Sequence, residues 1–241
     1  MFIITPGDRQ VPLLDQGLFY RKERSQLYKG IILEGISGTG KTSVFEALAN
    51  HKKMQSIPAK SRLILSEHHT QRILELEEQK GILTPPHHIE LLDQLVAFME
   101  HLDHRTTHRG WHSEYVQEQD LFFLFERFHL THVFRFPYMH WSQVVDIDHR
   151  LKPLGAVLCL LTVNGEILEN RLFSRRHECW LNYLKQYGDS PSQIVETLMK
   201  RQKMAQELAV LSTLPTLVID TSDNTIDQVT EYIAAKCLPD Y

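Results

Sequence analysis

The chain has 241 residues, of which 42% are hydrophobic and 23% charged, enough for one sizeable globular domain with its own core. The formal net charge of −4 excludes a surface that is basic throughout, so we expect no nucleic acid as a partner. Cys159, Cys179 and Cys237 are widely spaced and form neither a zinc pattern nor an even disulfide set, which fits a reducing compartment. No signal peptide and no apolar run near the ~18 residues of a membrane span are apparent, so a cytoplasmic protein with no membrane partner is predicted.

Residues 1–29 precede the first clear core strand and are predicted to be an N-terminal extension, in which Phe2-Ile-Ile is a candidate edge strand. From residue 30 to residue 241 we expect one domain. The predicted strands are 31–34, 62–66, 120–125, 155–162 and 216–220. The predicted helices are about 41–50, 70–79, 88–108, 138–149, 164–175, 192–211 and 225–236. Continuous apolar strands separated by helices predict an α/β three-layer sandwich with a five-stranded parallel sheet, whose ligands bind beyond the carboxyl ends of the strands.

The first predicted strand runs into the pattern G-x-x-x-x-G-K-[ST], and a helical pattern follows it. Strand, glycine-rich turn and helix are the context that a phosphate-binding loop requires, because glycines let backbone N–H groups converge on phosphate oxygens at a helix N-terminus. The nucleotide-binding residues expected here are Gly35, Ser37, Gly38, Thr39, Gly40, Lys41, Thr42 and Ser43. Lys41 would reach the outer phosphates, and Thr42 would offer its hydroxyl to Mg²⁺.

Charged side chains follow the other predicted strands. Glu67 comes after the second strand, and Glu126 and Arg127 come after the third. The helix after the fourth strand ends in a charged cluster of Arg171, Arg175, Arg176 and Glu178. Phosphoryl transfer needs cations that neutralise the transferred group and a carboxylate that holds metal or takes the acceptor's proton, so these residues are candidates for a site beside the phosphate loop.

Three segments resemble motifs of thymidylate kinases and deoxynucleoside kinases. Glu34-Gly-Ile-Ser-Gly-Thr-Gly-Lys-Thr resembles their E-G-x-x-G-x-G-K-[ST] loop. Glu126-Arg127-Phe128-x-x-Thr131 is similar to their D-R-Y-x-x-S or E-R-S-x-x-S segment, and Arg171-x-x-x-Arg175-Arg176-x-Glu178 is similar to their arginine-bearing lid, expected at about residues 171–190. The resemblance implies the fold of P-loop kinases, with ATP and Mg²⁺ as cofactors.

The resemblance also implies roles for single residues. Glu126 would lie near the metal, and Arg127 would contact the phosphate or sugar end of the acceptor. Glu67 would take the proton of the acceptor's hydroxyl, and Gln94 would read a base. The lid residues expected to close over the transferred group and its acceptor are Arg171, Arg175, Arg176 and Glu178.

The main functional hypothesis is therefore an ATP-dependent kinase of a nucleoside or nucleoside monophosphate, and because related kinases are often dimers, a homodimer is a candidate assembly. Ser66-Glu67-His68-His69-Thr70 lacks the arginine and Pro-Gly turn of thymidylate kinases and the Glu-Pro of deoxynucleoside kinases, so the acceptor stays open. One alternative is a P-loop kinase of a non-nucleoside small molecule. Another is a nucleotide-dependent regulatory ATPase, for which Leu217-Val-Ile-Asp220 is the nearest Walker-B pattern, late in the chain.

Histidine is abundant, with 14 residues. His101, His104 and His108 recur at i, i+3 and i+7 on one face of a predicted helix, a spacing that could share a transition metal. No cysteine or grouped acid completes such a site, and a polar helical face is the simpler interpretation.

Overall fold

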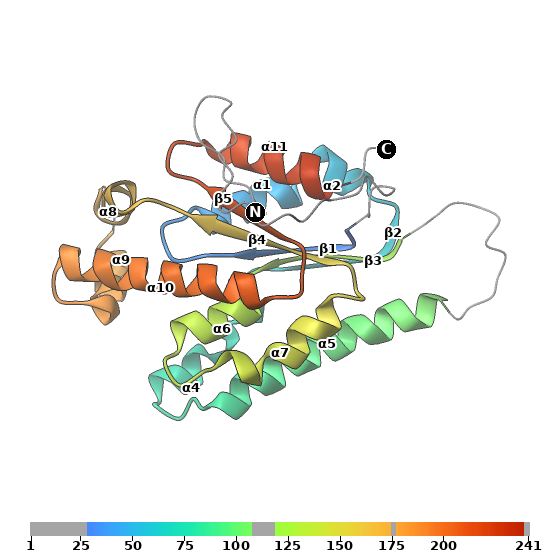
Figure 1. Ribbon diagram of the computed structural model, residues 1–241, viewed down its shortest axis with the longest axis horizontal. Coiled ribbons are helices and arrows are strands. Elements are labelled where there is room, and N and C mark those ends of the chain that lie inside the picture. The colour runs from blue at the N-terminus through green and yellow to red at the C-terminus, as the bar shows by residue number, and fades with distance from the viewer. Residues whose placement is uncertain (1–27, 108–118, 175–176, 239–241) are drawn as a thin grey trace.

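The computed structural model describes residues 28–107, 119–174 and 177–238. A parallel sheet of five strands lies at its centre, in the order β2-β3-β1-β4-β5 (Figure 1). The strands are β1 (Gly30–Glu34), β2 (Ala59–Leu65), β3 (Gln119–Glu126), β4 (Ala156–Thr162) and β5 (Thr216–Asp220). The predicted α/β fold with a five-stranded parallel sheet is confirmed.

The apolar runs become the inner strands because both of their faces are covered. Every residue of β1 and β4 is buried. Alternate side chains face opposite layers: Ile32 and Leu158 belong to one core cluster, and Ile31 and Val157 to the other. The register places Leu33 opposite Glu126, so the carboxyl ends of β1 and β3 meet at one edge of the sheet.

Helices form the outer two layers (Figure 1). The helices on one face are α1 (Lys41–Ala49), α2 (Lys52–Ser56) and α11 (Ile226–Cys237). The helices on the other face are α5 (Pro85–Thr107), α6 (His129–Arg135), α7 (Val145–Leu151) and α10 (Pro191–Leu211). Each of α10 and α11 begins at a capping side chain, Ser190 and Thr225 respectively, that accepts a hydrogen bond from a backbone N–H of the first turn.

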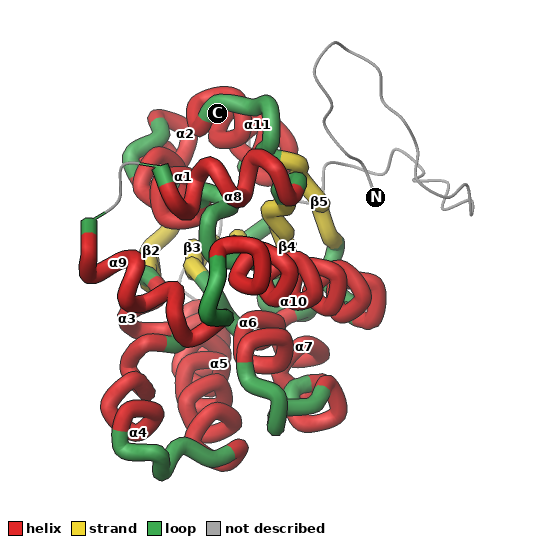
Figure 2. The backbone as a smooth tube through the Cα atoms, turned by 90° about the vertical axis from the view of Figure 1, so that its left-hand side faces the viewer, coloured by secondary structure: helices red, strands yellow, loops and turns green. Residues whose placement is uncertain are grey.

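The remaining described elements are short helices and turns. They are α3 (Glu67–Thr70), the 3₁₀ turn η1 (Arg72–Leu74), α4 (Glu75–Gln79), η2 (Trp141–Gln143), α8 (Gly165–Phe173), α9 (Glu178–Leu184) and η3 (Lys185–Tyr187). Figure 2 looks at the carboxyl edge of the sheet and shows α8 and α9 in front of the strands. The helix predicted at 70–79 is therefore three short pieces that begin at Glu67, and the helix predicted at 138–149 begins only at Trp141, as a 3₁₀ turn.

The helices α2, α6 and α9 were not predicted. The sequence of α6, His-Leu-Thr-His-Val-Phe-Arg, is rich in residues with modest helix propensity. A tertiary contact stabilises it instead, because the buried Glu34 carboxylate accepts hydrogen bonds from the backbone N–H groups of Leu130 and Thr131 in its first turn.

The predicted N-terminal extension is almost entirely untested by the structure. The candidate edge strand at Phe2 and nearly all of the predicted extension 1–29 lie outside the described residues. Lys29, which is described, donates its backbone N–H to the carbonyl of Gly155 at 2.9 Å. Among the described residues, no helix combines the length and apolar character needed to cross a bilayer.

Candidate functional site

The loop between β1 and α1 has the backbone that a phosphate cradle requires. Gly35 and Gly38 have φ angles of +139° and +89°, in the region that favours glycine. A Cβ on Gly35 would lie 2.4 Å from the carbonyl oxygen of Leu161, and one on Gly38 would lie 2.6 Å from Cδ1 of Leu168. The loop therefore needs glycine at both positions for its close packing as well as for its dihedrals.

Lys41 begins α1 and is buried beneath this loop. Its Nζ donates a 2.6 Å hydrogen bond to the carbonyl oxygen of Ile36. Burial, together with the nearby guanidinium of Arg127, lowers the pKa of Lys41 to about 7. An anionic ligand in the loop would favour the charged ammonium and oppose this shift.

Thr42 and Glu126 place two oxygen ligands side by side at the carboxyl edge of the sheet. The Thr42 hydroxyl donates a 2.6 Å hydrogen bond to Oε1 of Glu126, and Oε2 of Glu126 lies 3.5 Å from the backbone nitrogen of Glu67. Hydroxyl and carboxylate oxygens are the ligands that Mg²⁺ prefers. The pair therefore fits a magnesium ion held next to a phosphate chain.

Glu34 fixes the segment that follows β3. Its carboxylate accepts the backbone N–H of Phe128 at 2.9 Å and also the hydroxyl of Thr131. Between these anchors, Arg127 has a positive φ of +59°, which is uncommon outside glycine and places its side chain over the site. The loop motif includes Glu34, but the sequence does not predict that Glu34 anchors this segment.

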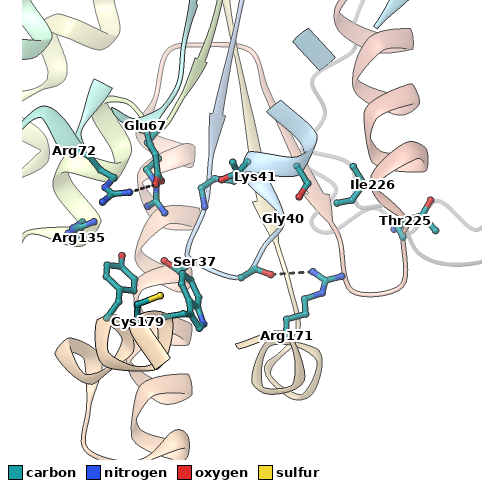
Figure 3. A pocket seen from close by; sticks show the side chains of 17 residues that line it. Ser37, Gly40, Lys41, Glu67, Arg72, Arg135, Arg171, Cys179, Thr225 and Ile226 are labelled. Carbon is teal, nitrogen blue, oxygen red and sulfur yellow. Dashed lines mark hydrogen bonds and ion pairs between the residues drawn. The ribbon is translucent and has the colours of Figure 1, made fainter. Parts of the chain in front are cut away.

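Glu67 forms the centre of a charged group opposite the loop. Its carboxylate pairs with Nε of Arg127 and lies 3.6 Å from a guanidinium nitrogen of Arg72 (Figure 3). Burial alone would raise the pKa of Glu67, but the ion pair and hydrogen bond with Arg127 outweigh it and lower the pKa below its ordinary value. Glu67 is therefore held as a carboxylate.

A cavity of about 670 Å³ joins the loop to this charged group. Figure 3 shows Glu67, Arg72 and Arg135 on one side of the loop and Arg171, Thr225 and Ile226 on the other. The lining residues are Ser37, Gly38, Gly40, Lys41, Thr42, Ser43, Glu67, Arg72, Arg127, Arg135, Arg171, Cys179, Trp180, Tyr183, Asn224, Thr225 and Ile226.

Arg171 extends from α8 to the back of the loop. Its guanidinium donates to the hydroxyl of Thr221 at 2.9 Å and lies 3.4 Å from the carbonyl oxygen of Gly38. Arg171 is thus tied to the loop and to the segment after β5, and it lines the end of the cavity away from Glu67.

The structure brings together most of the predicted site residues. Lys41, Thr42, Glu67, Arg127 and Arg171 line one cavity, and Glu126 touches it through Thr42. Thr39 is buried under the loop, where its hydroxyl donates to the carbonyl of Ile36.

Two of the residues expected to bind the acceptor, Gln94 and Glu178, do not line the cavity. Gln94 is exposed on α5, where its amide bonds to Glu90, and it does not line the cavity. Glu178 is exposed at the start of α9 and does not line it either. Arg175 and Arg176 lie outside the described residues.

Sequence reasoning missed several lining residues. Arg72 and Arg135 come from η1 and α6, and Trp180 and Tyr183 come from α9. Arg135 lies one helical turn beyond Thr131 of the Glu-Arg segment, a spacing that could have marked it.

The histidines considered above as transition-metal ligands do not form a metal site within the part of the chain that the structure describes. The described residues contain no group of three or more histidine, cysteine or acidic side chains that could hold a metal ion, and His108 lies outside them.

Comparisons with known proteins agree with the fold. No protein-family model and no curated protein matches the sequence. Among solved structures, the chain is similar to the YorR protein of Bacillus subtilis in complex with phosphorylated GDP, with a TM-score of 0.53 and 16% identity over 86% of this chain and 94% of that one. It is also similar to shikimate kinase from Bacteroides thetaiotaomicron, with a TM-score of 0.50 and 12% identity over 86% of this chain and 96% of that one. At these identities the likeness shows a shared α/β fold and no more.

Proposed function

We propose that this protein is an ATP-dependent phosphotransferase that moves the γ-phosphoryl group to a hydroxyl of a small molecule. One observation carries the proposal. The phosphate loop and the ion-paired Glu67 line the same cavity, so donor and acceptor have adjoining places in one volume. A protein that only binds or hydrolyses nucleotide has no need of the second half of this cavity.

At the donor end, the backbone of the glycine-rich loop and the ammonium of Lys41 bind the phosphates. Thr42 and Glu126 would hold Mg²⁺, which when bound neutralises charge on the phosphate oxygens. Lys41 stabilises the same charge from the side of the sheet. Arg171 holds the segment after β5 against the loop through Thr221.

At the acceptor end, Glu67 is positioned to accept the hydrogen bond of the attacking hydroxyl and then its proton. Arg127 holds this carboxylate ionised and oriented through their ion pair. Trp180 and Tyr183 of α9 also line the cavity, and their rings would exclude water from the transfer.

We favour a non-nucleoside small molecule as the acceptor. The cavity around Glu67 also contains the side chains of Arg72, Arg127 and Arg135. Gln94, the side chain expected to read a base, does not line it. A nucleoside monophosphate is the second candidate. It is supported by the stacked rings of Trp180 and Tyr183, whose centroids are 5.4 Å apart and which could extend their stack to a base.

The test is ADP release from Mg·ATP with a panel of small alcohols, hydroxy acids, sugars, nucleosides and nucleoside monophosphates. We expect stimulation by a member of one class, and loss of about 100-fold or more of the stimulated rate in Lys41→Ala. Lys52→Ala, which removes an exposed lysine of α2, is the matched control and should keep the wild-type rate. Hydrolysis of ATP that no acceptor stimulates, or full activity in Lys41→Ala, would contradict the proposal.

A further inference from the structure

Three arginines meet at a small second cavity. Arg127, Arg135 and Arg201 line this cavity, which has a volume of about 10 Å³. Ser37, Arg127 and Arg135 line both cavities, so the two adjoin. A volume of this size holds about one water-sized atom, which is also the size of one oxygen of a carboxylate or phosphate.

Two of these three arginines form ion pairs with carboxylates, and the third does not. Arg127 pairs with Glu67, and Arg135 pairs with Glu78 at 3.2 Å. Arg201 instead lies over the ring of Tyr187, 4.8 Å from its centroid, and within the described residues no carboxylate is within ion-pair distance of it. One of the three guanidinium groups at this cavity therefore has an aromatic neighbour in place of an acid.

Two phenols complete the polar lining. The hydroxyls of Tyr183 and Tyr187 are 2.9 Å apart, and Tyr183 lines the main cavity while Tyr187 lines the small one. Burial alone would raise the pKa of Tyr183, but the charges of Arg135 and Arg127 and the hydrogen bonds to Tyr187 and Ser37 together lower it. Burial and Arg135 also lower the pKa of Arg201. The charge of Arg135 contributes to both shifts, and an anion bound beside these groups would offset that charge.

We infer that the acceptor is an anionic hydroxyl compound whose carboxylate or phosphate group binds between Arg127, Arg135 and Arg201. The inference rests on the proposed function and names the chemical class of its acceptor. Planar guanidinium groups bind carboxylate and phosphate oxygens through paired hydrogen bonds, and of the hydrogen-bonded phenols Tyr183 and Tyr187, the one that accepts from the other keeps its own proton to donate. The anchored anion holds the compound so that its hydroxyl faces Glu67.

The experiment uses inorganic phosphate as the probe, with the full chain first saturated by Mg·AMP-PNP so that the phosphate loop is occupied. The shift in melting temperature on phosphate addition gives the phosphate affinity. We expect phosphate to stabilise the wild type, and Arg201→Gln to weaken the phosphate affinity about tenfold or more, because a hydrogen-bonded charge is lost. Lys200→Gln, which removes an exposed lysine one position away, should bind phosphate like the wild type.

A cooperative melting transition identifies a folded variant, and Arg201→Lys, which keeps the charge but loses the planar fork, should give an intermediate affinity if Arg201→Gln fails to fold. Equal stabilisation of wild type and Arg201→Gln by phosphate, or none in the wild type, would overturn the inference. Repeating the titration with malonate in place of phosphate separates a carboxylate acceptor from a phosphate monoester. If Mg·AMP-PNP does not bind the wild type, the proposed function fails. The anion site can still be tested in that case, because titrating the nucleotide-free chain with phosphate compares the phosphate affinity of Arg201→Gln with that of Lys200→Gln.

Discussion

The hydroxyl of Thr42 donates a 2.6 Å hydrogen bond to the carboxylate of Glu126, 84 residues along the chain. The bond joins the first turn of α1 to the end of β3. It is possible because β1 and β3 are paired in register, with Leu33 opposite Glu126. The parallel sheet thus assembles a pair of hard oxygen ligands beside the glycine-rich loop.

Removing the Thr42 hydroxyl should weaken magnesium binding. We expect Thr42→Ala to lower the Mg·ATP-dependent rate about 100-fold or more, because a metal ligand contributes several kcal/mol at the transition state. Titrating Mg²⁺ at fixed ATP measures the effect as a rise in the Mg²⁺ concentration needed for half the maximal rate. Thr42→Ser, which keeps the hydroxyl, should behave like the wild type, and an unchanged Mg²⁺ requirement in Thr42→Ala would exclude this metal site.

Nucleotide binding should take up a proton at Lys41. The pKa of Lys41 is about 7 in the free protein, so at pH 8 the Lys41 side chain is neutral in most molecules. Bound phosphates favour the ammonium and raise this pKa, so binding at pH 8 draws up to about one proton from solution. Calorimetric titration with AMP-PNP in buffers of different ionisation enthalpy measures the number of protons taken up per nucleotide bound. Lys41→Met should show no uptake, and wild-type binding without proton uptake would argue against a lysine–phosphate contact.

The ion pair of Arg127 with Glu67 should set the acid limit of the reaction. Arg127 lowers the pKa of Glu67, so Glu67 stays ionised to a lower pH than a free glutamate. In Arg127→Gln this pKa rises, and activity falls at a higher pH as the solution is acidified. The pH dependence of kcat/KM records the change, with Arg127→Lys as the variant that retains the charge. If kcat/KM falls at the same acidic pH in wild type and in Arg127→Gln, Glu67 does not take part in the proposed proton transfer.

Glu34 should matter for stability although it does not line the cavity. Its buried carboxylate accepts three backbone N–H groups and the hydroxyl of Thr131. Glu34→Gln puts an amide donor against these donors, and we expect it to lower the free energy of unfolding by about 2–4 kcal/mol. Urea denaturation measures this loss. Glu46→Gln, at an exposed position of α1, should change the free energy of unfolding little, and a similarly small change in Glu34→Gln would show that this cap is not needed.

Much of the fold follows from local sequence signals. The apolar strands and the loop motif predict the parallel sheet because both signals lie within a few consecutive residues. The helix α6 could not be predicted in this way, since Glu34 stabilises it from β1. The same holds for the split of the predicted 70–79 helix, where Thr70 donates its hydroxyl to the carbonyl of Glu126 and ends α3.

Some residues of the site could likewise be predicted from local sequence signals, and others depend on tertiary packing. Glu126 is the last residue of β3, and Glu67 and Arg127 lie within two residues of a strand end, so the topology of a parallel sheet brings the three together. Gln94 was assigned from a weak local match, but α5 buries Leu92 and Val96 against the core and leaves Gln94 exposed. Arg201 depends on how α10 packs beside α6, which no local pattern specifies.

The crystal structure of the chain with Mg·AMP-PNP tests the central claim most directly. The account predicts that the β- and γ-phosphates lie against the backbone from Gly35 to Thr42, with Lys41 Nζ turned to them and Mg²⁺ at about 2.0–2.1 Å from the Thr42 hydroxyl. Phosphates bound elsewhere, with this loop and Glu126 free of both metal and nucleotide, would contradict it.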